Sequence, residues 1–168
     1  RAATLFRRRV QSQVPHGRAL LQAKTHSDRD ALVRLATLLA IAELPPQPAL
    51  GLSVAAVLEK PENLDDAWML DAATSAAARN DTAFLSAVLG TPSPNQAMLS
   101  RLTVVAEHLT RGDQRGIAQG LITKLADAKP PVVDAVLAGL AAGWPEDTPL
   151  RIDDALDKQL MGLLDKAS

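Results

Sequence analysis

Residues 31–44 read ALVRLATLLAIAEL, and this stretch decides the fold. Ala, Leu, Val and Ile fill nearly every position, so a helix formed here is apolar on all sides. Such a helix must be buried on several sides. The first helix of each pair in a helical-repeat array contacts its partner and both neighbouring repeats, which supplies that burial. Residues 132–142 show the same pattern, whereas 113–127 and 151–166 are more amphipathic and resemble second helices.

Helix-length segments continue in both directions from this stretch, separated by Pro, Gly and capping residues. The predicted helices are 28–44, 48–60, 65–79, 81–90, 95–111, 113–127, 130–143 and 149–166, with two more expected over 15–25 and 2–12. Because the connections are short, consecutive helices are expected to run antiparallel.

Small polar residues mark the predicted helix starts. Ser27 precedes the helix 28–44, and Ser93-Pro94-Asn95-Gln96 has the form of a capping box. Asp65, Asp81 and Asp113 are the expected caps of three more helices. Gly112 is expected to end a helix in the left-handed conformation, and Asn80 to do the same one repeat earlier.

An internal repeat links these helices. Eight-residue segments that begin at residues 33, 69, 99 and 132 align with one another, and the eighth position is always small: Ala40, Ala76, Ala106 and Gly139. A period of 30–40 residues with two helices per period is typical of a helical-repeat array. The sequence therefore predicts an all-α protein, an α-α superhelix of about four to five antiparallel pairs. The pairs fall within a single domain, 1–168, and cover 1–27, 28–60, 65–90, 95–127 and 130–167.

Composition narrows the classes of function. The 168 residues carry a formal net charge of −1, no Cys, and only 2% aromatic residues. Near-neutral charge argues against nucleic acid and anionic membranes as partners. The lack of Cys excludes thiolate metal sites and covalent c-type haem attachment within this chain. No apolar run approaches the ~18 residues of a membrane span. Arg7-Arg8-Arg9 is interpreted as a solvated helix face, with a phosphate-binding patch as the alternative.

The segment Asp30-Ala31-Leu32-Val33-Arg34-Leu35-Ala36 resembles the Asp-x-x-Val-Arg-x-Ala core of HEAT repeats. Residues 20–89 are also similar to the HEAT segment of large multidomain proteins abundant in planctomycetes and verrucomicrobia. Those proteins join a sugar-dehydrogenase-like β-propeller, a HEAT array and a c-type cytochrome domain. The later first helices lack the Val-Arg pair, as degenerate repeats often do.

The resemblance implies a HEAT-like solenoid that acts as a spacer or docking module of an exported, periplasmic redox enzyme. Its partners would then be the neighbouring domains of the same parent chain. The chain begins with Arg rather than Met, which also suggests a piece of a longer protein. Without that relationship, the expected function is a protein-binding scaffold.

The sequence contains no recognisable catalytic, cofactor or metal site. His16, His26 and His108 do not share ligand spacing, and the paired acids at 65–66, 146–147 and 153–154 stand at helix starts, where anions are favoured. No nucleophile elbow, phosphate-binding loop or dinucleotide motif occurs. A helical-repeat enzyme that acts on DNA bases would need a basic groove, which the charge balance disfavours.

The expected interaction surface lies on the second helices. Arg115 and Gln119 are spaced i,i+4 and therefore share a helix face, and Asp154 and Lys158 repeat that spacing. These four residues are the candidate binding stripe. Trp68 is expected to pack between repeats. Trp144, before Pro145, is interpreted as a lid on the last repeat, with a partly exposed contact as the alternative.

Overall fold

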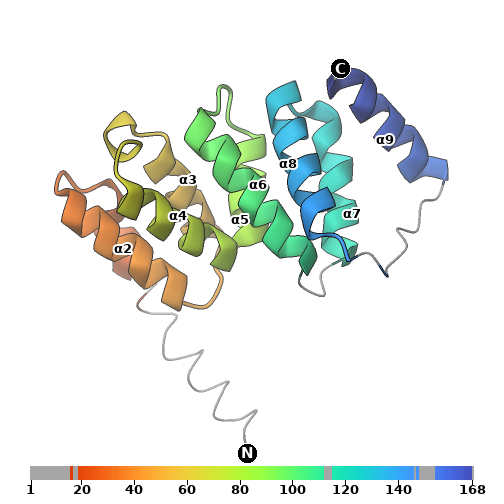
Figure 1. The fold of residues 1–168 in the computed structure, drawn as a ribbon. Coiled ribbons are helices and arrows are strands. Elements are labelled where there is room, and N and C mark those ends of the chain that lie inside the picture. The colour runs from red at the N-terminus through yellow and green to blue at the C-terminus, as the bar shows by residue number, and fades with distance from the viewer. Residues whose placement is uncertain (1–15, 17–18, 112–114, 146, 148–153, 168) are drawn as a thin grey trace, which may run out of the picture. The chain divides into compact units, whose positions relative to one another are not determined.

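The computed structural model describes residues 16, 19–111, 115–145, 147 and 154–167 (Figure 1). Within these, the side chains of 115–119, 155–156 and 164–167 are not described. The structure divides into two compact units, residues 1–84 and 85–168. Every regular element among the described residues is an α-helix or a 3-10 helix, which confirms the all-α class.

The first unit contains η1 (Thr25–Ser27), α2 (Ala31–Glu43), α3 (Pro48–Leu58), η2 (Pro61–Asn63) and α4 (Ala67–Arg79). Helix α5 (Asp81–Leu89) begins in the first unit and ends in the second. The second unit continues with α6 (Gln96–Arg111), α7 (Arg115–Lys124), η3 (Leu125–Asp127), α8 (Pro130–Gly143) and α9 (Asp154–Ala167). Residues 19–23 are also helical, whereas the predicted helix 2–12 lies outside the described residues.

Two aspartates cap equivalent helices 36 residues apart, as the sequence repeat requires. Asp30 accepts a hydrogen bond from the Leu32 amide at 2.8 Å. Asp66 accepts one from the Trp68 amide at 2.9 Å and a longer one from Met69 at 3.3 Å. Each carboxylate satisfies donors that the first turn of its helix leaves free. Leu32 and Trp68 each follow the capping aspartate by two residues, so they stand at the same place in their helices.

These observations correct three predicted caps. Ser27 does not cap α2, because it lies in η1 and its hydroxyl donates to the Lys24 carbonyl at 2.9 Å. Asp65 precedes the true cap by one residue. Ser93 does not open α6, because Asn95 takes that role by accepting from the Met98 amide at 2.9 Å.

The start of α5 also differs from the prediction. The helix begins at Asp81 itself, and the Asn80 carbonyl accepts from the Phe84 amide at 2.9 Å. Asn80 has φ −120°, so it is not left-handed. Its buried side-chain amide makes one long-range hydrogen bond, to the Gln47 backbone, and one local hydrogen bond, to the Ala76 carbonyl. The predicted turn at Gly112 and Asp113 lies outside the described residues.

Asn80 and Arg79 tie the end of α4 to the turn between α2 and α3. The Asn80 Oδ1 accepts from the Gln47 amide at 2.9 Å, and its Nδ2 donates to the Ala76 carbonyl at 3.0 Å. Arg79 Nε donates to the carbonyl of Leu44, which ends α2, at 2.9 Å. Both contacts satisfy backbone groups that the helix ends leave unpaired.

A second buried network joins α2 to the end of α3. Arg34 is 4% exposed, and its Nε donates to Asn63 Oδ1 at 2.9 Å. The same guanidinium donates to the carbonyls of Asp28 at 2.8 Å and Arg29 at 3.0 Å. Asn63 is fully buried and donates from Nδ2 to the Val57 carbonyl at 2.7 Å. Arg34 therefore organises three chain segments through neutral acceptors.

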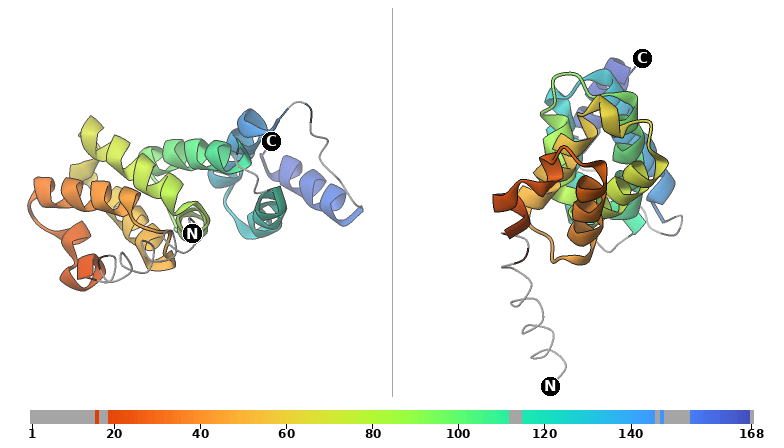
Figure 2. Two further views of the ribbon diagram at one scale, coloured as in Figure 1. Left: turned by 90° about the horizontal axis from the view of Figure 1, so that it is seen from below. Right: turned by 90° about the vertical axis from the view of Figure 1, so that its left-hand side faces the viewer.

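Within each unit, the most extensive packing joins two helices that are not consecutive along the chain. Helix α2 lies beside α4, and α6 beside α8 (Figures 1 and 2). Small residues permit these close approaches: Ala72, Ala73, Ala76 and Ala77 of α4 are all buried. At Gly139 of α8, an added Cβ would overlap the Thr103 carbonyl of α6.

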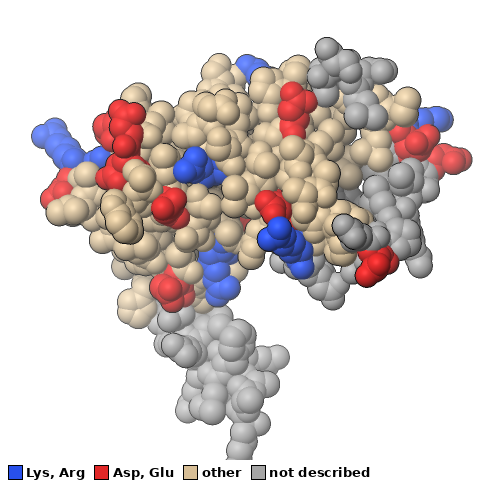
Figure 3. All heavy atoms as spheres, viewed as in Figure 1, with Lys and Arg blue, Asp and Glu red and all other residues tan. Residues whose placement is uncertain are grey.

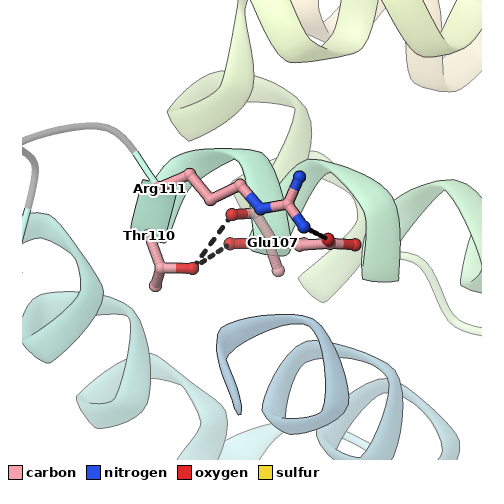
Figure 4. A network of polar contacts seen from close by, with 4 residues as sticks. Glu107, Thr110 and Arg111 are labelled. Carbon is pink, nitrogen blue, oxygen red and sulfur yellow. Dashed lines mark hydrogen bonds and ion pairs between the residues drawn. The ribbon is translucent and has the colours of Figure 1, made fainter. Parts of the chain in front are cut away.

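The same close approach continues one turn later, at Gly143. An added Cβ there would overlap the Glu107 carbonyl and the Thr110 hydroxyl of α6. Figure 4 shows that this hydroxyl is directed back at its own helix, where it donates to the carbonyls of Glu107 at 3.0 Å and Ala106 at 3.2 Å. The Arg111 side chain pairs with the Glu107 carboxylate at 2.5 Å. The polar side chains at the end of α6 therefore find their partners within α6. At Gly143, α8 has no side chain, so only its backbone meets this part of α6.

The predicted small position on α4 gives a direct test of this packing. Ala76 is fully buried, whereas its repeat equivalent Ala40 is half-buried. We expect Ala76→Leu to lower the free energy of unfolding by about 1–3 kcal/mol through overpacking, and Ala40→Leu to lower it less. Chemical denaturation followed by circular dichroism measures both. The exposed neighbour Ser75→Leu serves as control, and equal midpoints for Ala76→Leu and Ser75→Leu would contradict the expectation.

Candidate interaction surface

The stripe predicted on the second helices is only partly described. Arg115 opens α7 and Gln119 follows one turn later, but the side chains of both lie outside the described residues. Asp154 opens α9 and Lys158 follows one turn later, and both side chains are exposed. The structure therefore places one half of the predicted stripe in solvent.

Lys158 also borders a small open hollow beside α9. The lining residues are Ala126, Lys158, Gln159, Gly162 and Leu163. Gln159 is held at the edge by the Thr123 hydroxyl, which donates to its Oε1 at 3.2 Å. Among the described residues of the lining, Lys158 is the titratable one.

A different surface carries the largest exposed apolar side chains of the first unit. Trp68 is 77% exposed and Leu32 is 72% exposed, although both were expected to be buried from the sequence. The prediction that Trp68 packs between repeats is wrong, and α2 is not covered on all sides. The physical reason is that both residues stand two positions after an N-cap, on the side of α2 and α4 that no described element covers.

The exposed side chains form a line along each helix. Leu32, Ala36, Leu39 and Glu43 of α2 are all exposed and recur at three- and four-residue steps. On α4 the corresponding exposed line is Trp68, Asp71, Ser75 and Arg79. Helices α2 and α4 pack on each other, and the two lines occupy equivalent positions of these helices, so the two lines are named together here as the α2/α4 face.

Acidic residues outnumber basic ones in the first unit. Residues 19–84 contain nine Asp and Glu and five Lys and Arg. Figure 3 shows acidic side chains gathered over the loop between α3 and α4. Asp65 and Asp71 flank Trp68, and Glu43 follows Leu39 by one turn, all three exposed. Among the described residues the ion pair is Arg111–Glu107, which belongs to the second unit, so these carboxylates have no ionic partner there.

Trp144 is the second predicted anchor. It ends α8 and is half-buried, and its amide donates to the Ala141 carbonyl at 3.4 Å. The Arg7–Arg9 cluster lies outside the described residues.

Ligand-forming side chains do not converge in the described part of the chain. No group of three or more His, Cys, Asp or Glu side chains is placed there to hold a metal ion. His16 and His108 are exposed. Across the same residues, no helix has the length and apolar character needed to cross a bilayer.

His26, in η1, is the one titratable group in the described part of the chain whose pKa departs clearly from its ordinary value. Its pKa is lowered from the ordinary value of 6.5, first by partial burial and then by the charges of Lys60 and Lys24. The unfolded chain therefore binds a proton more readily than the folded chain. Stability from the neutral imidazole is fully present above pH 6.5 and is lost as the pH falls below 6.5.

We therefore expect the native chain to lose stability between pH 7.5 and 5.5, and His26→Gln to lose less over the same interval. Urea denaturation at the two pH values measures both, because only the difference between variant and native chain isolates His26 from the carboxylates. An equal loss in both chains would contradict the assignment to His26.

Comparison of the whole chain with protein-family models, with curated proteins and with solved structures gives no match.

Proposed function

We propose that the chain is a non-catalytic, HEAT-like helical-repeat scaffold that binds a protein or a neighbouring domain of its own parent chain. One observation carries the proposal: Leu32 and Trp68, large apolar side chains at equivalent repeat positions, are directed to solvent. Side chains so exposed contribute little to the core of their unit. Contiguous exposed apolar residues typically mark a binding surface.

Repetition supports the scaffold reading. The Asp30 and Asp66 caps recur 36 residues apart, and in each unit one first helix packs on the next. A repeat array presents the same positions of successive helices along one surface. Binding through such a surface needs exposed side chains at repeated positions, which α2 and α4 provide.

The test measures binding of the folded chain to the domains encoded on either side of it in the same gene. We expect saturable binding by isothermal titration calorimetry to at least one domain. If that domain is a propeller or a haem protein, the chain is the docking segment of a redox enzyme. Failure of every flanking domain to bind would overturn docking within the parent chain and leave a separate protein as the partner.

Two sets of substitutions then locate the surface. One set is Arg115→Ala with Gln119→Ala and Lys158→Ala, on the second helices. The other is Leu32→Ser with Trp68→Ser, on the α2/α4 face. The set that weakens binding identifies the side of the repeat in use, and circular dichroism confirms that each variant is folded.

A further inference from the structure

We infer that the α2/α4 face binds a basic amphipathic helical segment of a protein partner. The inference rests on the proposed function and deepens it by naming the chemistry of the partner. Three features of the face carry it: the spacing of its apolar side chains, the excess of carboxylates around them, and the lack of an ionic partner for those carboxylates among the described residues.

The apolar side chains are spaced for a helix. Leu32 and Leu39 are seven residues apart on α2 and are 72% and 52% exposed. Two helical turns separate them, a rise of about 10 Å. The same distance separates i and i+7 anchors on a partner helix, which is the recurrent pattern of helix recognition by an apolar surface. Trp68, on the neighbouring helix, adds the residue type most enriched among binding hot spots.

The charges around these anchors select a cationic partner. Asp65, Asp71 and Glu43 are exposed and unpaired within the described residues. Two exposed basic residues border the same face: Arg79, which already donates from Nε to the Leu44 carbonyl, and Arg29, three positions before Leu32. The three carboxylates still outnumber them. A partner with Lys or Arg beside its apolar anchors places opposite charges across the contact, which speeds association and disfavours wrong partners.

The same charges argue against a second copy of this chain as occupant. A symmetric dimer brings one patch against its own copy. The carboxylates of the α2/α4 face would then meet like charges, which costs free energy. A basic segment has no such penalty, so the face fits a heterologous partner better than itself.

The probe is a synthetic amphipathic peptide of about sixteen residues, long enough to form a helix, with Leu and Phe on one face and Lys on the other. Two matched peptides accompany it: one with every Lys replaced by Glu, and one with every Leu and Phe replaced by Ser. Binding is followed by calorimetry and by tryptophan emission. Because Trp68 is exposed, its emission shifts to shorter wavelength when an apolar anchor covers it.

The variants separate this face from other exposed apolar residues. Leu32→Ser with Trp68→Ser removes the anchors, and Asp65→Asn with Asp71→Asn removes two charges while keeping the Asp66 cap. The matched control is Leu52→Ser on α3, whose side chain is 56% exposed in the same unit. None of these residues is buried, so circular dichroism and denaturation midpoints are expected to match those of the native chain.

We expect the Lys peptide to bind, and the Glu and Ser peptides to bind at least about tenfold more weakly. Leu32→Ser with Trp68→Ser is expected to weaken binding at least about tenfold. Leu52→Ser leaves binding unchanged. Affinity falls as salt increases, and falls less steeply in the Asp65→Asn, Asp71→Asn variant, because salt screens exposed charges.

Several results overturn the inference. Equal binding of the Glu and Lys peptides would show that charge does not select the partner. An equal loss of affinity in Leu52→Ser and in Leu32→Ser with Trp68→Ser would show that the peptide does not bind specifically at the α2/α4 face. Dimerisation of the chain that is abolished by Leu32→Ser with Trp68→Ser assigns the face to self-association instead. If a flanking domain binds but none of the peptides does, the proposed scaffold function stands while this inference fails.

Discussion

Replacement of Gly139 or Gly143 by alanine is expected to lower the free energy of unfolding by about 3 kcal/mol in each case, the upper part of the usual range for overpacking. At Gly139 the new methyl group would overlap the Thr103 carbonyl and lie 2.8 Å from the Ala106 Cβ. At Gly143 it would overlap the Glu107 carbonyl. A side chain could rotate away, but a helical carbonyl moves only if α6 and α8 separate. That separation removes dispersion contacts along the whole helix pair.

Two other helical glycines provide the control. Gly120 of α7 and Gly162 of α9 have no atom within 4 Å of an added Cβ. Alanine at these positions relieves the low helix propensity of glycine, so stability is expected to rise by up to about 1 kcal/mol. Guanidinium denaturation compares the four variants. A Gly139→Ala midpoint equal to that of Gly120→Ala would show that α6 and α8 do not approach closely.

These four glycines also show where sequence reasoning stops. Each one interrupts an apolar helical pattern, and each costs about 1 kcal/mol relative to alanine unless packing requires it. Gly139 aligns with Ala40, Ala76 and Ala106 at the small position of the repeat, so the sequence marks it. Gly143 lacked that alignment. No local signal separates Gly143 from Gly120, because the difference is the distance to another helix.

Helix positions were predictable because their signals are local. Helices α3 and α8 begin with Pro48 and Pro130, as predicted, since proline suits the first turn. Caps were less predictable where candidates lie close together. Both Asp65 and Asp66 suit the role, and the choice depends on backbone angles that the preceding turn sets.

Exposure of the α2/α4 face was not predictable from composition. An apolar segment such as 31–44 indicates burial on all sides only if neighbours cover every side. The repeat alignment already placed Leu32 and Trp68 at equivalent positions, and the structure adds that both side chains are exposed. Burial is a property of the assembled helices, whereas apolar character is a property of the segment.

Loss of either member of the Arg34–Asn63 pair is the second large effect that we expect. Asn63→Leu leaves the Arg34 Nε without its partner in a buried site. It also removes the side-chain hydrogen bond to the Val57 carbonyl, which still accepts from the Lys60 amide at 3.3 Å. Buried polar groups that lose a partner cost about 1–3 kcal/mol each, and more if one is charged. We therefore expect Asn63→Leu to lower the free energy of unfolding by about 3 kcal/mol, and Arg34→Met by about 2–3 kcal/mol.

The double variant Arg34→Met, Asn63→Leu separates pairing from packing. Removing both partners together leaves fewer unpaired groups than the two single changes do. The combined loss is therefore expected to be smaller than the sum of the single losses by about 1–2 kcal/mol. Arg29→Met, at an exposed side chain beside the network, should stay within about 0.5 kcal/mol of the native chain. Strictly additive losses in the double variant would show that Arg34 and Asn63 act independently. Arg34 would then contribute through its aliphatic stem rather than through its hydrogen bonds.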